Sequence, residues 1–283
     1  MRDDFAIFIL SHGRADNVVT LKALKDSNYH GKWYIVIDNE DKQEENYYKN
    51  FGKEHILKFD KVKKSSEFDT CDMPYAQRNT IVYARNVSFD LAKELGLTYF
   101  MELDDDYTEF RSRVLINDSL KSIYVKDLDN VLEAMIEFLD TSGALSVAMS
   151  QIGDFIGGAG SKVFKERLTR KCMNSFICRT DRPFDFIGRI NEDVNTYVYQ
   201  ASIGNLMFTI ADVSLNQLST QQNKGGMTTA YLDNGTYIKS FYSIITNPSS
   251  VKISTIGVTQ HRYHHLVLWE NCAPKIISDK FRK

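Results

Sequence analysis

The sequence predicts an α/β fold with a mostly parallel, Rossmann-like central sheet flanked by helices, in a single domain with a C-terminal extension. Residues 5–10 form a continuous apolar run, typical of a central strand that is buried on both faces. A helical pattern over 15–27 and a second strand over 33–37 complete a βαβ unit, which implies a parallel pair and a right-handed crossover. The composition, 43% hydrophobic and 25% charged in 283 residues, is ordinary for a globular protein with a substantial core.

Polar side chains follow the first two predicted strands. Ser11-His12-Gly13-Arg14 interrupts the first, and the second ends in Asp38-Asn39-Glu40-Asp41. Ligands of open α/β sheets bind at the carboxyl ends of the strands, where an acid after the second strand suits a nucleotide base or ribose. The sequence has neither GxGxxG nor GxxxxGK[ST], which argues against a Rossmann NAD site and a phosphate-binding P-loop.

The next segment leads to a long helix. Residues 56–59 can form a third short strand, and residues 65–74 have the composition of a loop. From Tyr75 to Gly96 the apolar spacing predicts a helix with one buried face, stopped by the glycine. Arg85 in this helix can belong to a solvated face or to a site.

Three adjacent carboxylates end the apolar run 97–103. Asp104, Asp105 and Asp106 repel one another unless a positive charge lies between them. A divalent cation is the natural candidate, and a nucleotide diphosphate would complete its coordination. The alternative is a solvated acidic turn that caps the next helix.

The second half continues the α/β pattern. Residues 125–141 predict an amphipathic helix, and residues 144–149 and 206–215 predict strands. Residues 153–160 are rich in glycine but lack a phosphate-loop lysine, and residues 220–228 form a polar loop that is a candidate lid.

Basic residues are concentrated between Lys162 and Arg182, where seven bases stand against two acids. Such bases with interleaved aromatics can follow a phosphate backbone and stack on bases, although the aromatics can equally belong to the core. The formal net charge is −2, so any nucleic-acid contact has to come from a local patch. We take as candidates Lys162, Lys165, Arg167, Arg170 and Lys171.

Two further clusters have alternative interpretations. Glu192-Asp193 can start a helix, with the acids near its positive end, or it can supply a general base across a cleft from the metal. Half of the six histidines fall in the tail, and one of them can be a third protein ligand of the metal or an ordinary surface or core residue: His261, His264 and His265.

The sequence also predicts a compartment. The four cysteines show no CxxC spacing, so neither zinc nor a disulfide framework is indicated. Met1-Arg2-Asp3-Asp4 leads straight into a strand, and no apolar run has membrane-spanning length. We therefore expect a reduced cytoplasmic protein without membrane contact.

The order of these motifs resembles the GT-A nucleotide-sugar glycosyltransferases of the inverting kind. The matching features are the Ala84-Arg85-Asn86 helix, the aspartates at a strand end and the later Glu192-Asp193. More closely, several stretches resemble the TET-associated glycosyltransferase domain of DNA-modifying bacteriophages: Ile9 to Arg14, Trp33 to Asp41, Gly188 to Asp193, and the tail from His261 to Trp269.

The resemblance implies a reaction and a division of labour along the chain. It implies a metal-dependent, inverting transfer of a sugar from a UDP-sugar to 5-hydroxymethylcytosine in double-stranded phage DNA, with Mn²⁺ or Mg²⁺, in the host cytoplasm. Residues 1–110 would bind the nucleotide sugar, and residues 111–283 would bind the acceptor and carry the tail. A GT-A enzyme with a protein or polysaccharide acceptor, and a non-catalytic nucleic-acid-binding module, are the alternatives.

The resemblance also assigns roles to individual residues. Asp193 would be the base, oriented by Glu192. Asp106 would be the more direct metal ligand, with Asp104 nearer the ribose and sugar, and the extra Asp105 leaves the register of the D-x-D pair open. His261, His264 or His265 would complete the metal shell. The nucleotide sugar would be bound by Ser11, His12, Arg14, Asp38, Arg85, Asp104 and Asp105.

Overall fold

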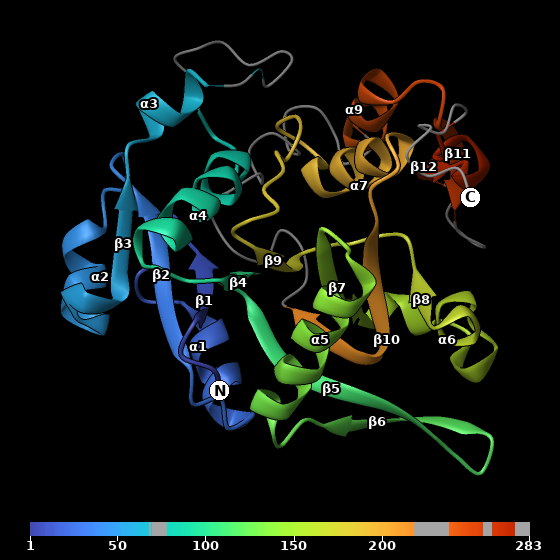
Figure 1. Cartoon of the computed structure of the whole chain (residues 1–283), viewed down its shortest axis with the longest axis horizontal. Coiled ribbons are helices and arrows are strands. Elements are labelled where there is room, and N and C mark those ends of the chain that lie inside the picture. The colour runs from blue at the N-terminus through green and yellow to red at the C-terminus, as the bar shows by residue number, and fades with distance from the viewer. Residues whose placement is uncertain (68, 70–77, 218–237, 257–261, 275–283) are drawn as a thin grey trace.

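A computed structural model describes residues 1–67, 69, 78–217, 238–256 and 262–274, and its centre is one large sheet (Figure 1). The strand order is β3-β2-β1-β4-β9-β7-β10-β5-β6, and β8 pairs with β10. The strands are β1 (Phe5–Leu10), β2 (Lys32–Asp38), β3 (Ile56–Phe59), β4 (Tyr99–Asp104), β5 (Tyr107–Ile116), β6 (Ser119–Tyr124), β7 (Ser146–Gln151), β8 (Leu168–Thr169), β9 (Ser175–Arg179) and β10 (Met207–Gln217).

Most strands of this sheet point the same way. The pairs β1–β2, β1–β4, β2–β3 and β7–β10 are parallel. Among the described strands of the sheet, β5, β8 and β9 run opposite to the rest, because each pairs antiparallel with its neighbours. The predicted mostly parallel central sheet is therefore confirmed, with these reversed strands making it mixed.

Helices cover both faces of the sheet. The helices of the described chain, with short 3₁₀ turns labelled η, are α1 (Val19–Asp26), α2 (Glu44–Phe51), η1 (Lys53–His55), α3 (Lys61–Ser65), α4 (Val82–Glu94), α5 (Leu128–Ser142), η2 (Ile152–Phe155), η3 (Gly158–Gly160), α6 (Lys162–Glu166), α7 (Glu192–Ser202), α9 (Ile238–Thr246) and η4 (Trp269–Asn271). No helix in the described ranges combines the length and apolarity needed to cross a membrane.

The alternation of side chains along β1 creates two cores. Phe5, Ile7 and Ile9 pack with α1 and α5 on one face, whereas Ala6 and Phe8 pack with α4 and α7 on the other. All six residues of β1 are buried, as expected of a strand covered on both sides.

A smaller unit follows the large sheet. Strands β11 (Val251–Ile256) and β12 (Arg262–Val267) form an antiparallel hairpin, and α9 lies beside α7 (Figure 1). This unit is the predicted C-terminal extension. The candidate lid at residues 220–228 lies outside the described residues.

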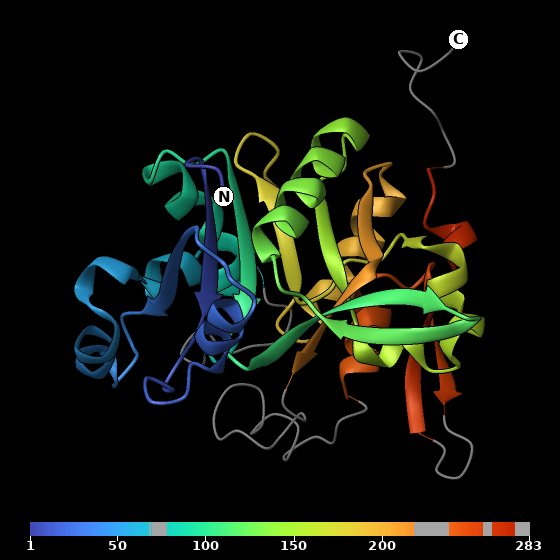
Figure 2. The ribbon, with the colours of Figure 1, turned by 90° about the horizontal axis from the view of Figure 1, so that it is seen from below.

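Six of the described strands were not predicted from the sequence: β5, β6, β8, β9, β11 and β12. β5 and β6 form a hairpin that extends away from β1–β4 (Figure 2), and β9 lies between β4 and β7. The arginines of β5 interrupt its apolar pattern, and β9 is a short apolar piece inside the basic stretch. Because β5 begins at Tyr107, the three aspartates join two strands and do not cap a helix.

Candidate active site

The carboxyl ends of β1, β2 and β4 meet at one edge of the sheet, because these strands are parallel neighbours. Leu10 at the end of β1 stands opposite both Val36 of β2 and Asp104 of β4. The loop after β1, the acids after β2 and the three aspartates after β4 therefore gather at this edge, as predicted.

The middle aspartate has a structural role. Asp105 is 2% exposed, and its carboxylate accepts hydrogen bonds from Ser11 Oγ at 2.7 Å and Arg14 Nη1 at 2.7 Å. Ser11 Oγ also lies 2.8 Å from the hydroxyl of Tyr47. These hydrogen bonds hold the loop after β1 against the turn after β4. The residues that make them include Ser11, Arg14 and Asp105, which were predicted to bind the nucleotide sugar.

Asp104 and Asp106 flank this buried residue, and both are partly exposed. Burial is the main cause that raises the pKa of Asp104 to about 7, with Arg85 opposing it and the charges of Asp106 and Glu192 adding to it. Burial and the neighbouring Asp105 raise the pKa of Asp106. The Thr20 hydroxyl fixes the turn by donating to the Asp104 carbonyl at 2.6 Å. The pair that remains for a ligand is Asp104-x-Asp106.

Arg85 joins the two halves of the candidate site. Its side chain is 1% exposed, and it donates to Asp104 Oδ1 at 3.1 Å and to Glu192 Oε1 at 3.0 Å. Its guanidinium carbon lies 5.0 Å from the ring centre of Phe176. One cation thus connects the acids after β4 to the acids that begin α7, although these segments lie far apart in the sequence.

Glu102 belongs to the same network and was not predicted. It is completely buried in β4, and its Oε2 accepts from Arg85 Nη1 at 3.3 Å. Its Oε1 has no hydrogen-bond partner in the described part of the structure. Burial raises the pKa of Glu102 to about 8, so this carboxyl is largely neutral at pH 7. An acid inside an apolar strand was the signal in the sequence.

The loop before α7 determines the position of the Glu192-Asp193 pair. Gly188 has a φ of 78°, and a Cβ there would meet the Asn195 amide nitrogen at 3.0 Å. That amide donates to the carbonyls of Ile187 and Ile190 at 3.1 Å each, which closes the loop. Helix α7 begins at Glu192, so the pair both starts a helix and lies in the site.

Asp193 has the properties of a proton acceptor. It is 6% exposed, and its Oδ1 accepts from the Val194 backbone N–H at 2.7 Å. Burial, followed by the charge of Glu192, raises the pKa of Asp193 to about 7. A carboxylate that titrates near neutral pH suits general-base catalysis.

The predicted nucleotide-base contact, Asp38, is engaged by neighbouring side chains. It is 4% exposed and accepts from Lys61 Nζ at 3.1 Å, while His12 Nδ1 lies 2.7 Å from the same oxygen. Burial acts to raise the pKa of Asp38, but the hydrogen bonds from His12 and Lys61 keep it below its ordinary value. The His12 side chain is 47% exposed and so is the accessible member of this group.

In the part of the chain that the structure describes, His264 and His265 do not join the aspartates in a group that could hold a metal ion. His261 lies outside the described residues, and His264 Nδ1 lies 2.7 Å from the backbone oxygen of His265. The described chain contains no group of three or more His, Cys, Asp or Glu side chains placed to hold a metal ion. The donor chemistry that fits a hard divalent cation is the carboxylate pair Asp104 and Asp106.

Three of the five basic residues assigned to DNA make contacts within the protein. Arg167 pairs with Asp212, Lys171 pairs with Asp154, and Arg170 donates to the Trp269 carbonyl at 2.9 Å. Lys162 and Lys165 are exposed, with Lys162 3.8 Å from Glu166. Arg167 is also exposed, and the assignment of all five residues to DNA stays a prediction.

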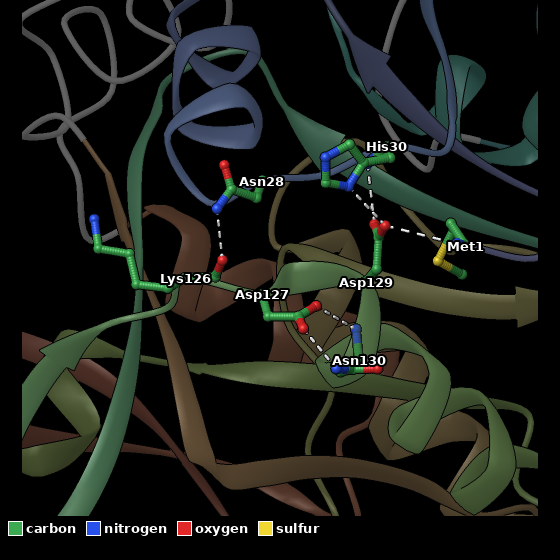
Figure 3. Close-up of a pocket in the computed structure, with 7 residues that line it drawn as sticks. All are labelled: Met1, Asn28, His30, Lys126, Asp127, Asp129 and Asn130. Carbon is green, nitrogen blue, oxygen red and sulfur yellow. Dashed lines mark hydrogen bonds and ion pairs between the residues drawn. The ribbon is translucent and has the colours of Figure 1, made fainter.

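A surface hollow lies at the opposite end of the sheet, before β1 and β2 (Figure 3). Its Asp129 accepts from the His30 backbone at 3.1 Å and lies 3.6 Å from the Met1 amino group, while Asp127 caps α5 by accepting from Asn130. These groups hold together the amino ends of β1, β2 and α5. The hollow is not part of the candidate site.

The family model described as TET-Associated Glycosyltransferase matches residues 5–226. A comparison with curated protein sequences finds no match.

Solved structures also show similarity. A mycobacterial protein shares 8% identity at a TM-score of 0.48, covering 93% of this chain and 83% of that one. Glucosyl-3-phosphoglycerate synthase from Mycobacterium tuberculosis, in complex with Mn²⁺, UDP and phosphoglyceric acid, shares 8% identity at 0.47, covering 93% and 86%. TarS 1-349 from S. aureus shares 11% identity at 0.42, covering 86% of this chain and 64% of that one.

Proposed function

Because the chain belongs to the TET-associated glycosyltransferase family, we propose that this glycosyltransferase moves a sugar from a UDP-sugar to 5-hydroxymethylcytosine in double-stranded DNA, with inversion. The observation that carries the proposal is the connection made by Arg85 between Asp104 and Glu192. It links a strand-end carboxylate pair suited to a metal–diphosphate with a carboxylate suited to proton transfer.

The donor side rests on charge. Burial and then the charge of Asp106 raise the pKa of Asp104, and Arg85 supplies one positive charge for this cluster. A divalent cation such as Mn²⁺ or Mg²⁺, held by these two carboxylates, would neutralise charge on the leaving diphosphate. His12, oriented by Asp38, is placed at the end of β2 where the nucleotide base would lie.

The acceptor side rests on Asp193. Its carboxylate would take the proton of the hydroxymethyl group as that oxygen bonds to the anomeric carbon. The bond between the anomeric carbon and the diphosphate oxygen breaks in the same displacement, and UDP leaves from the opposite face. A single base therefore implies inversion of configuration. Glu192, held by Arg85, would fix the start of α7 and so orient its neighbour.

The test is a transfer assay. The protein is incubated with hydroxymethylated duplex DNA, Mn²⁺ or Mg²⁺ and a panel of UDP-sugars. The DNA is then digested, and the masses of its nucleosides are measured by mass spectrometry. We expect a nucleoside heavier by one sugar. Asp193→Asn should slow transfer about a hundredfold, the usual contribution of a general base, with unchanged donor and DNA binding.

Asp185→Asn is the control, because Asp185 is an exposed acid on the same loop. Equal transfer rates for Asp193→Asn and wild type would refute the assignment of the base. If no donor leads to a sugar on the DNA, and the sugar is instead transferred to a protein or polysaccharide, the proposed DNA acceptor is refuted.

A further inference from the structure

The C-terminal unit contacts the loop that carries the candidate base. Residues 238–256 and 262–274 follow the end of the family match at residue 226. Several described residues of this unit nevertheless bond to the segment around Glu192-Asp193. Tyr242 OH accepts from Arg189 Nε at 2.6 Å, Ser243 Oγ accepts from Asn191 at 2.7 Å, and Asn247 Nδ2 donates to the Asn195 carbonyl at 3.3 Å.

Helix α9 is held by these polar contacts as well as by apolar packing, since Ile244 lies against the core on the α4–α7 side of the sheet. Its fully buried residues include Ser240 and Ser243, whereas Ile245 is 69% exposed. An amphipathic helix normally buries its apolar side. Here polar residues also face inward, because the segment before α7 supplies hydrogen-bond partners for Tyr242 and Ser243.

Asn191 is the closest of these links to the base. It precedes Glu192 directly and has φ 59° and ψ 34°, a left-handed conformation that asparagine tolerates better than most residues. Its Nδ2 lies 2.7 Å from Ser243 Oγ of α9 and 3.3 Å from His265 Nδ1 of β12. One side chain therefore joins the start of α7 to α9 and β12 of the C-terminal unit.

We propose that Asn191 is a positioning residue that locks the Glu192-Asp193 pair to α9 and β12, so that the C-terminal unit sets the Asp193 carboxylate for proton abstraction. The proposal rests on the proposed function. The left-handed backbone directs Glu192 toward Arg85, and the amide holds that backbone in place. Without the amide, the first turn of α7 would move more freely, and misplacement of a reacting group is costly in rate.

Two variants separate the backbone from the side chain. Asn191→Gly retains access to the left-handed conformation but has no amide. Asn191→Asp retains the size and the backbone tolerance but replaces the amide donor by a carboxylate, which could only accept from Ser243 or His265 and adds a negative charge beside Glu192. Asn28→Gly is the matched control, since Asn28 has a φ of 53° and donates to the Lys126 carbonyl at 2.9 Å, beside the hollow at the opposite end of the sheet.

We expect kcat for transfer to fall about tenfold or more in both Asn191 variants, with the donor KM and stabilisation by UDP with Mn²⁺ unchanged. Amide hydrogen exchange should rise in the first turn of α7 and in α9, and Asn28→Gly should change none of these. Adding Ser243→Ala to Asn191→Gly should cost less than its effect in wild type, because the partner is already lost.

Folded Asn191 variants with wild-type kcat and wild-type exchange would overturn the lock. A fall of kcat together with donor affinity and melting temperature would also overturn it, because that pattern indicates general destabilisation. A wild-type protein that transfers no sugar to DNA would instead refute the proposed acceptor. Amide hydrogen exchange in α7 and α9 would then test whether Asn191 holds α7 to the C-terminal unit. Unchanged protection of these amides in both variants would refute that role.

Discussion

The guanidinium of Arg85 carries one positive charge and faces three carboxylates, those of Glu102, Asp104 and Glu192. It cannot neutralise all of them, and burial raises the pKa of Glu102 to about 8 and of Asp104 to about 7. At neutral pH the cluster therefore retains protons that a bound cation would displace. The residues expected to hold that cation are Asp104 and Asp106.

Two neighbouring aspartates should respond in opposite ways to the same substitution. Asp106→Asn should abolish most of the stabilisation by UDP with Mn²⁺ while the melting temperature of the free protein changes little. Asp105→Asn should reduce the free energy of unfolding by about 3 kcal/mol, because it breaks a buried ion pair with Arg14. Thermal unfolding with and without UDP and Mn²⁺ measures both effects.

Each variant is the control for the other, since both remove one charge from the same turn. Full transfer activity of Asp106→Asn in excess chelator would refute the metal site. A wild-type melting temperature for Asp105→Asn would refute its structural role.

The candidate site was predictable at the residues where charge interrupts an apolar pattern. Asp104, Asp106 and Arg85 stand out in this way, whereas the Glu192-Asp193 pair lies in a polar segment and was assigned its role through the family resemblance. The sequence could not show that Asp105 points inward and not toward a ligand. The direction of a side chain in a turn depends on partners from another segment, here Arg14 and Ser11. The hydrogen bond from Lys61 to Asp38 could not be predicted for the same reason.

At the level of elements, α6 and β8 show how a basic stretch can serve the fold. Arg167 and Lys171 pair with Asp212 and Asp154, so these cations fasten α6 and β8 to β10 and η2. Charge counted along a sequence does not distinguish such cations from those that face solvent. Lys162 and Lys165 are the exposed lysines of this segment.

Replacing both Lys162 and Lys165 by alanine should weaken DNA binding and reduce its salt dependence. Each lost phosphate contact lowers the slope of log K against log salt by about 0.9. Titrations of duplex DNA at several salt concentrations measure this slope. Lys25→Ala with Lys93→Ala is the control, because these exposed lysines lie on α1 and α4. An unchanged slope for Lys162→Ala with Lys165→Ala would place the DNA surface elsewhere.

The elements predicted best are those with one strong local pattern. The apolar runs of β1, β2 and β3 and the amphipathic pattern of α5 were recognised almost to the residue. Strands β5 and β9 were not, since arginines interrupt the first and surround the second. Their position depends on pairing with β10, β4 and β7, which no local pattern specifies.

At the level of the molecule, one continuous sheet runs through both of the predicted halves, residues 1–110 and 111–283. Strand β5 spans Tyr107–Ile116 and so crosses that boundary, and β9 fills the position between β4 and β7. We expect a fragment of residues 1–117 to lack cooperative unfolding, because the edge of β4 would have no partner. Circular dichroism during heating measures this.

A fragment of residues 118–283, added to the first, should restore a cooperative transition and UDP binding. The break falls at Asn117 and Asp118, exposed residues in the turn between β5 and β6. A sharp thermal transition of the first fragment alone would show that the nucleotide-sugar half folds independently.

The position of β9 also has a consequence during synthesis on the ribosome. Strand β4 is complete at Asp104, but its antiparallel neighbour, Ser175–Arg179, is made much later. At elongation rates of about 5–20 residues per second, the open edge of β4 persists for several seconds in the nascent chain. During that interval, Tyr99 to Leu103 present a mostly apolar strand with unpaired backbone groups to solvent. The yield of folded protein should therefore depend on chaperones that bind the growing chain before β9 emerges.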